Sequence, residues 1–307
     1  METRQQAQRH QYTIGWVSAL PIELAAAEAM LDEKHETPPQ NASDTNIYTL
    51  GRVGKHNVVI ACLPDSQMGT KSAAVVATQM RSTFPTIVFT LMVGIGGGVP
   101  QATLDIRLGD VVVATNTGFQ RTGFLNTPPT ILLNAIARLK ANHIGEQPSF
   151  RKDVSKLNRI DTFNREVAGP DYLFSADYDH ISGDTCERCD RKMLVERTQR
   201  DQEAMIHYGT IASGNQVMRN ALERDRISSE LDGALCFDME AAGLMNDFQC
   251  LVIRGISDYA DSHKNKRWQG YAAGTAAAYA KELLAVLPTI NNVSNLRKGL
   301  RKTTKKP

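Results

Sequence analysis

The hydrophobic pattern of this chain alternates between short apolar runs and longer amphipathic or alanine-rich segments. Short apolar runs bounded by Gly, Pro or Asp are typical of strands, whereas apolar positions three and four residues apart predict helices. We expect strands at residues 12–20, 46–50, 55–63, 86–93, 110–114, 208–213, 235–237 and 251–256. We expect helices at residues 22–31, 70–81, 130–141, 216–230, 239–247 and 271–287.

The order of these elements predicts the fold class. Strands that alternate with helices form a largely parallel sheet covered by helices on both faces. Residues 142–203 are charged and interrupted, so we expect an excursion with little regular structure there. We therefore expect one α/β domain with a mostly parallel or mixed central sheet over residues 12–288, between a polar segment (1–11) and a basic flexible tail (289–307).

Composition narrows the class of protein. The 307 residues are 42% hydrophobic, enough to bury a large core, and the net charge of +2 does not favour a nucleic-acid partner. The uncompensated basic residues near the C-terminus are typical of a solvated tail, and no apolar run is long enough to cross a bilayer. Five cysteines and a polar start indicate reduced thiols and a soluble, cytoplasmic protein without a membrane partner.

Polar residues follow several apolar runs, where ligands of open α/β sheets collect. The glycine run at residues 94–98 has Val99 where a dinucleotide fingerprint needs its third glycine, and it lacks the Lys-Ser/Thr of a P-loop. Gly96 and Gly97 would let a ligand approach the backbone closely, or they would form a tight turn after the strand. The residues alone leave both readings open.

Two acids at strand ends suit nucleoside chemistry. Glu240 can complement the dipole of the helix it opens, or it can accept both hydroxyls of a sugar diol beside the soft surface of Met239. Asp258 and Ser257 are candidate helix caps, and Asp258 is also a candidate general acid for a departing purine. These interpretations also stay open on the residues alone.

The segments Asp-Met-Glu-Ala-Ala at 238–242 and Ile-Ser-Asp-Tyr-Ala-Asp at 256–261 resemble the nucleoside phosphorylase/nucleosidase superfamily. The resemblance extends from about residue 12 to residue 284. Strings at residues 15–21, 93–100 and 212–218 are similar to a fungal branch that is often fused to NACHT or ankyrin-repeat regions. The resemblance implies the nucleoside phosphorylase-like fold and cleavage of a purine N-glycosidic bond.

The resemblance also implies a role for each matching residue. Asp258 would protonate the purine at N7, and Glu240 would hold the ribose hydroxyls. Glu23 would activate a water molecule, with Arg254 near that water. The other substrate-binding positions would be Met239, Asp238, Asn215, Gln216, Val217, Gly96, Gly97 and Ser257. No metal or organic cofactor is expected in catalysis, and the resemblance allows a homodimer.

The nucleophile is expected to be water. A phosphorylase must hold a dianion, yet Met92 stands where the resembling phosphorylases have an arginine, and Ile95 replaces their Ser/Thr donor. A carboxylate at Glu23 would repel phosphate. We therefore expect hydrolysis of a purine nucleoside or nucleotide with release of the free base. The alternatives are phosphorolysis and a signalling module that binds nucleosides with little turnover.

Other features have less specific interpretations. The connection at 115–122 is shorter than in the resembling family, which puts part of the pocket wall in doubt, although Phe119 or Phe124 could compensate. Cys186 and Cys189, with His180 upstream, resemble half of a zinc site, but the remaining cysteines lie far off in predicted strands or buried positions, so zinc is the less favoured interpretation. His207 is expected to be structural. Trp268 and Tyr271 would form either a lid over the base or part of the hydrophobic core.

Overall fold

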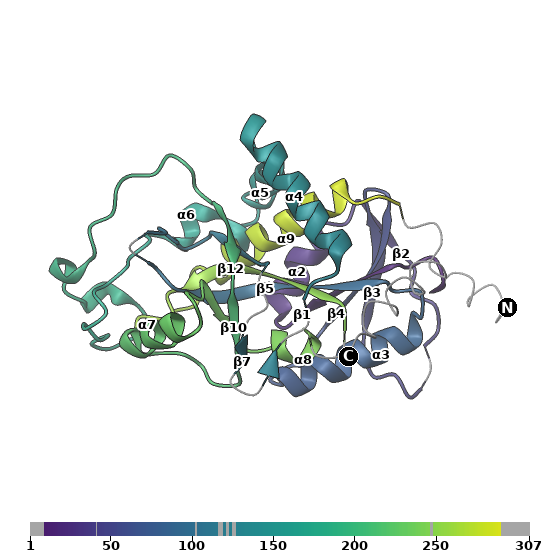
Figure 1. Ribbon diagram of the computed structural model, residues 1–307, viewed down its shortest axis with the longest axis horizontal. Helices are drawn as coiled ribbons and strands as arrows, with labels where there is room; N and C mark the ends of the chain where they lie inside the picture. The colour runs from purple at the N-terminus through teal and green to yellow at the C-terminus, as the bar shows by residue number, and fades with distance from the viewer. Residues whose placement is uncertain are drawn as a thin grey trace.

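The computed structural model describes residues 9–40, 42–101, 103–115, 119–120, 123–124, 127–245 and 248–289. Most of its strands form one mixed sheet in the order β2-β3-β4-β1-β5-β12-β6-β9, and β11 joins it by pairing with β5 and β10 (Figure 1). The strands are β1 (Ile14–Ser18), β2 (Glu33–His35), β3 (Tyr48–Val53), β4 (His56–Cys62), β5 (Phe89–Gly98), β6 (Val111–Ala114), β9 (Ile206–Gly209), β10 (Ile211–Ser213), β11 (Cys236–Asp238) and β12 (Cys250–Asp258). A separate hairpin pairs β7 (Phe119–Gln120) with β8 (Gly123–Phe124).

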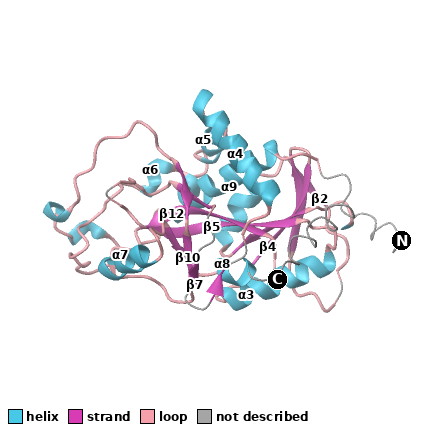
Figure 2. Cartoon of the chain, in the orientation of Figure 1, coloured by secondary structure: helices cyan, strands magenta, loops and turns pink. Residues whose placement is uncertain are grey.

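Helices cover both faces of this sheet (Figures 1 and 2). The long helix α9 lies against β12 and β5 and packs with α2, α4 and α5, whereas α3 and α8 pack together on the opposite face. The α-helices are α2 (Pro21–Ala29), α3 (Thr70–Thr83), α4 (Thr130–Gly145), α5 (Phe150–Leu157), α6 (Arg165–Ala168), α7 (Ala221–Glu230), α8 (Ala241–Met245) and α9 (Gln269–Val286). The predicted α/β class is confirmed.

The centre of the sheet positions the candidate site. Strand β5 runs parallel to both β1 and β12, so the carboxyl ends of these three strands lie at one edge. Strand β12 is buried along its whole length, as expected for a continuous apolar run between two helical layers. Gly255 allows this close packing because a Cβ there would collide with the carbonyl oxygen of Ala272 in α9.

Several local predictions were wrong. The strand expected to end at residue 93 continues to Gly98, because β12 on one side and β11 on the other pair with the glycines. Of the two open readings of these glycines, a tight turn after the strand is excluded. Residues 208–213 divide at Thr210 into β9 and β10, which pair with different strands. The helix expected from residue 216 begins at Ala221, where the Asn220 side chain accepts a hydrogen bond from the Glu223 amide (2.9 Å).

The charged excursion contains more structure than expected, because α4 continues to Gly145 and α5 follows it. The predicted terminal segments fall largely outside the described residues, as does much of the 115–122 connection with the side chains of Phe119 and Phe124. Across the described ranges, none of the helices combines the length and apolar content needed to span a bilayer.

Candidate active site

Glu23 lies in the first turn of α2, directly after β1. One carboxylate oxygen accepts hydrogen bonds from the backbone amides of Ala19 (2.6 Å) and Leu20 (3.1 Å). The other accepts a hydrogen bond from the Ile95 amide in β5 (2.8 Å). The side chain is buried, so these donors replace the water that a carboxylate would otherwise need. Glu23 is therefore held rigidly at the shared edge of β1 and β5.

Arg254 reaches the same edge from β12 and is fully buried. Its Nε donates to Asp238 Oδ2 (3.0 Å), its Nη2 donates to the same oxygen, and its Nη2 lies 3.6 Å from Glu240 Oε2. Its Nη1 is buried without a hydrogen-bond partner among the described residues. Three carboxylates, those of Glu23, Asp238 and Glu240, thus surround one guanidinium group.

Burial raises the pKa of two of these acids, Glu240 and Glu23. Burial raises the pKa of Glu240 to about 7; Arg254 opposes this increase, and Asp238 and Glu23 add to it. Burial also raises the pKa of Glu23, against the effects of Arg254 and the three backbone donors. Glu240 can therefore change its protonation state near neutral pH more readily than an exposed carboxyl can.

Gly94 is the glycine that this arrangement requires. A Cβ at this position would collide with the Glu23 carboxylate and lie 2.5 Å from Arg254 Nη1. By contrast, a Cβ at Gly96 would meet Cys236 Sγ at 2.5 Å, and one at Gly97 would meet Asp258 Oδ1 at 2.9 Å. The sequence predicted binding roles for Gly96 and Gly97, but Gly94 is the glycine at which a side chain would collide with both the acid and the arginine.

Asp258 is the last residue of β12. The pairing of β12 with β5 is irregular between Ile256 and Asp258, so Ser257 lies outside the regular pairing. The Ser257 hydroxyl lies 3.0 Å from Asp258 Oδ2, and the Ala260 amide donates to Asp258 Oδ1 (3.0 Å). Lys264 Nζ lies 3.2 Å from Asp258 Oδ2. Lys264 is not among the site residues that the sequence predicted.

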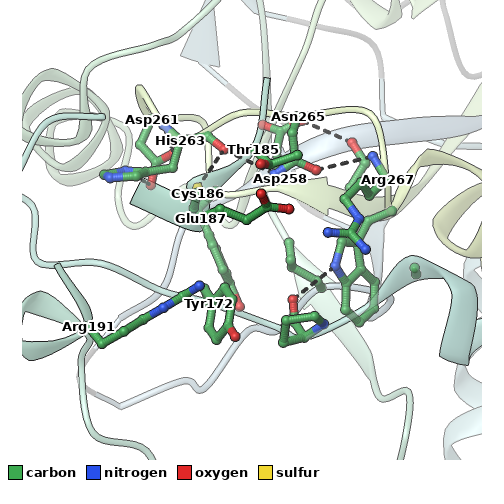
Figure 3. Close-up of a pocket in the computed structure, with 16 residues that line it drawn as sticks. Tyr172, Thr185, Cys186, Glu187, Arg191, Asp258, Asp261, His263, Asn265 and Arg267 are labelled. Atoms are coloured by element: carbon green, nitrogen blue, oxygen red, sulfur yellow. Dashed lines mark hydrogen bonds and ion pairs between the residues drawn. The ribbon is translucent and has the colours of Figure 1, made fainter. Parts of the chain in front are cut away.

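Asp258 lines a cavity of about 170 Å³ together with Ser257, Trp268 and residues of the excursion (Figure 3). Small-molecule pockets usually enclose roughly 300–1,000 Å³, so this volume suits a fragment of a nucleoside better than the whole ligand. Trp268 and Tyr271 are both buried, and Trp268 also forms part of the cavity wall.

Some predicted binding residues lie apart from this cavity. Asn215, Gln216 and Val217 are exposed, and none of them lines the cavity. The Asn215 side chain instead accepts hydrogen bonds from the amide (3.3 Å) and hydroxyl (3.2 Å) of Thr70 at the start of α3. Asp238 holds Arg254 and accepts a hydrogen bond from the Ala241 amide (3.2 Å), while Met239 is half-buried beside Glu240.

Comparison with protein families now identifies the class. The model of the family described as Phosphorylase superfamily matches residues 13–287, and the chain belongs to this superfamily. The resemblance inferred from the two signature segments is confirmed.

Two kinds of relatives were found among known proteins. A nucleotide-binding leucine-rich repeat (NLR)-like protein of Hyaloscypha variabilis is 45% identical over 90% of this chain and 29% of its own length. A 5′-methylthioadenosine/S-adenosylhomocysteine nucleosidase of Mycobacterium bovis is 26% identical over 91% of this chain and 98% of its own length. The ATP nucleosidase Cap17 of Escherichia coli is 24% identical over 87% of this chain and 50% of its own length.

Solved structures share the fold. A 5′-methylthioadenosine/S-adenosylhomocysteine nucleosidase of Neisseria meningitidis, in complex with methylthio-immucillin-A, has a TM-score of 0.58 at 17% identity, covering 90% of this chain and 99% of that chain. A futalosine hydrolase of Helicobacter pylori has a TM-score of 0.53 at 17% identity, covering 89% of this chain and 97% of that chain.

Proposed function

We propose that this chain hydrolyses the N-glycosidic bond of a purine nucleoside or nucleotide and releases the free base. The observation that supports this most directly is the buried Nη1 of Arg254, which lies beside the Glu23 carboxylate and has no hydrogen-bond partner among the described residues. A water molecule can accept a hydrogen bond from this N–H and give a proton to Glu23. Such a water would be both oriented and activated.

The remaining acids suit the two other parts of the substrate. Glu240 lies near Arg254 and can accept hydrogen bonds from the 2′- and 3′-hydroxyls of ribose when it is ionised. Asp258 can donate a proton to N7 of the purine, which makes the base a better leaving group. The carboxylates of Glu23 and Glu240 would stabilise the positive charge that develops on the sugar.

The charge balance favours water over phosphate. Arg254 faces three buried carboxylates, so its positive charge is already compensated before any ligand enters. With these acids ionised, the net negative charge of the site would repel a phosphate dianion but not a neutral water molecule. Met92 is buried in β5 at the position where a phosphate arginine would be needed. Phosphorolysis is therefore the less favoured alternative.

The named activities of three similar proteins, two nucleosidases and a futalosine hydrolase, also support hydrolysis as the proposed reaction. The chain spans 29% of the length of its NLR-like relative and 50% of Cap17. We propose that residues 12–288 form a nucleoside-binding domain and that the protein acts in the cytoplasm. The unpaired state of all five cysteines is compatible with a reducing compartment.

A second candidate function is a module that binds a purine nucleoside without useful turnover. Two observations favour it, namely the small cavity at Asp258 and the cation of Lys264 paired with the proposed acid. This module would be stabilised thermally by purine nucleosides while releasing negligible base.

The two functions can be separated by one assay. Purified chain is incubated with adenosine, inosine, methylthioadenosine, AMP and ATP, with and without phosphate, and free base is measured by chromatography. We expect base release that needs no phosphate, with oxygen from labelled water in the sugar product. Dependence on phosphate would overturn hydrolysis. Ligand-induced thermal stabilisation without any base release would establish the binding module instead.

A further inference from the structure

A cluster of sulfur and imidazole ligands lies beside the cavity, outside the acids discussed above. Cys189 Sγ lies 3.4 Å from His180 Nδ1, and Cys186 Sγ lies 3.8 Å from the same nitrogen. Ligand atoms of His180, Cys189 and His263 all lie within 4.8 Å of one another. Cys186 Sγ is also 3.9 Å from the carbonyl oxygen of His263, above it in Figure 3. Three potential metal ligands therefore converge from two segments of the chain, and Cys186 places a fourth beside His180.

The surroundings leave one nitrogen of each histidine available for a metal. His180 Nε2 lies 2.9 Å from the carbonyl oxygen of Gly183, so Nε2 carries the proton and Nδ1 directs its lone pair toward the sulfurs. His263 Nδ1 lies 3.8 Å from Asp261 Oδ2. His263 Nε2 is buried and has no hydrogen-bond partner within the described part of the chain. A metal-binding histidine typically has its other nitrogen facing a carbonyl or carboxylate oxygen, as both do here.

We propose that Cys186, Cys189, His180 and His263 bind one Zn²⁺ ion. In tetrahedral zinc sites the bonds are about 2.0–2.3 Å long, which separates neighbouring ligand atoms by roughly 3.3–3.8 Å. The two sulfur–nitrogen separations of 3.4 and 3.8 Å lie in this range. The Cys-x-x-Cys spacing and the Cys₂His₂ composition are those of structural zinc sites, and four protein ligands leave no position open for a substrate.

The local fold shows what this metal would hold together. The hydrophobic cluster of the excursion has three buried members, Phe174, Cys186 and Cys189, and is separate from the main core. From Cys186 to Met193 the regular structure consists of two single 3₁₀ turns. Such a small core stabilises a long segment poorly, and small units of this kind usually depend on a metal or a disulfide.

The site would also link the excursion to the segment that follows the proposed general acid. His263 is five positions after Asp258 and 77 residues from Cys186 in the sequence, yet both His263 and Cys186 line the cavity that contains Asp258. The metal would thereby fix one wall of this cavity. This inference concerns metal content and does not depend on which reaction, if any, the cavity supports.

Metal content provides the test. The full chain, freed of any affinity tag, is purified without added metal, and zinc is measured by inductively coupled plasma mass spectrometry. We expect about one equivalent of zinc per chain, since the four ligands form one site. We expect Cys189→Ser and His263→Ala to lose most of it. The matched control Cys62→Ser removes a thiol in β4 that is not part of the cluster, and it should retain the metal.

Cobalt exchange covers the case in which a variant fails to fold. Zinc in the unmodified chain is replaced by Co²⁺, and we expect the intense visible bands of a tetrahedral site together with thiolate-to-cobalt charge transfer. Absence of zinc and of these bands in the unmodified chain would refute the proposal. A disulfide between Cys186 and Cys189, detected as a mass lower by two hydrogens, would also refute it. Equal loss of zinc in Cys62→Ser and Cys189→Ser would do the same.

Discussion

Lys264 Nζ lies 3.2 Å from Asp258 Oδ2, so the carboxyl group proposed to protonate the purine is paired with a cation in the unliganded protein. The Lys264 side chain is 35% exposed, whereas that of Asp258 is 5% exposed. The lysine can therefore move into solvent when a base approaches the acid.

Replacing Lys264 should improve ligand binding. Lys264→Met removes the cation that competes with a purine for Asp258, and we expect the KM for the preferred nucleoside to fall. A partly exposed ion pair is worth up to about 1 kcal/mol, so the decrease should not exceed about fivefold. Lys266→Met removes an exposed cation two positions away and is the control. Steady-state kinetics that show a higher KM for Lys264→Met would contradict this role.

Asp258→Asn should separate binding from turnover. The amide cannot act as a general acid, and loss of such a group typically lowers the rate by about 10²- to 10⁴-fold. Binding of the nucleoside should persist, because an amide still forms hydrogen bonds. Single-turnover base release and calorimetric binding measure the two effects. Unchanged base release in a variant that unfolds at the normal temperature would exclude Asp258 as the acid.

Ribose binding should depend on the ionisation of Glu240. Burial raises the pKa of Glu240 to about 7, and only the ionised carboxylate can accept hydrogen bonds with both oxygens. Affinity should therefore decrease as pH falls below about 7. The stability of the unliganded protein should instead decrease as pH rises from about 4.5 toward 7, because the pKa of Glu240 is higher in the folded state than in the unfolded state.

Glu240→Gln provides the control for this pH dependence. The amide does not titrate, so the affinity of this variant should be lower and nearly independent of pH between about 5 and 8. Calorimetric titrations across this range measure the effect. An identical pH profile in the variant would assign the dependence to another group.

Asp110 should make stability decrease in acid. Burial raises its pKa, but hydrogen bonds from His207 (2.8 Å) and Arg200 (2.6 and 2.9 Å) outweigh burial and hold the pKa below its ordinary value. A lowered carboxyl pKa adds stability above the unfolded value of about 3.9, and that stability is lost as pH falls through the folded value.

Asp110→Asn removes this stabilisation, leaves Arg200 without its counterion and deprives His207 of its carboxylate partner. Breaking a buried pair typically costs about 3–5 kcal/mol, and we expect a loss of about 3 kcal/mol because the amide retains some hydrogen bonds. Asp105→Asn, at a half-exposed carboxylate paired with Arg107, should change stability much less. Urea unfolding at pH 4 and pH 7 measures both variants. Equal losses in the two variants would argue against the network.

Gly94→Ala should damage the site without changing any titratable residue. Its Cβ would displace the Glu23 carboxylate and Arg254 Nη1, and overpacking of this kind typically costs about 1–3 kcal/mol. We expect base release to fall much further than stability. Gly145→Ala, where the added Cβ would meet no atom within 4 Å among the described residues outside its own helix and chain neighbours, should leave both unchanged. Full activity in Gly94→Ala would show that the position tolerates a side chain.

The sequence by itself determined the class of the fold and, through the family resemblance, predicted the principal acids of the proposed site. Buried strands such as β12 are recognisable because a strand covered by helices on both faces is largely apolar. Glu240 and Asp258 are recognisable because each stands in a short segment that resembles the family. These signals are carried by neighbouring residues, so one sequence is sufficient to detect them.

The tertiary structure alone decided which distant residues meet. Pairing of β5 with both β11 and β12 placed the glycines inside a strand, and it brought Gly94 between Glu23 and Arg254. The segment that follows β12 places Lys264 beside Asp258 and His263 beside Cys186. Such contacts depend on strand order and on the close packing of helices against the sheet, which join residues that no local pattern connects.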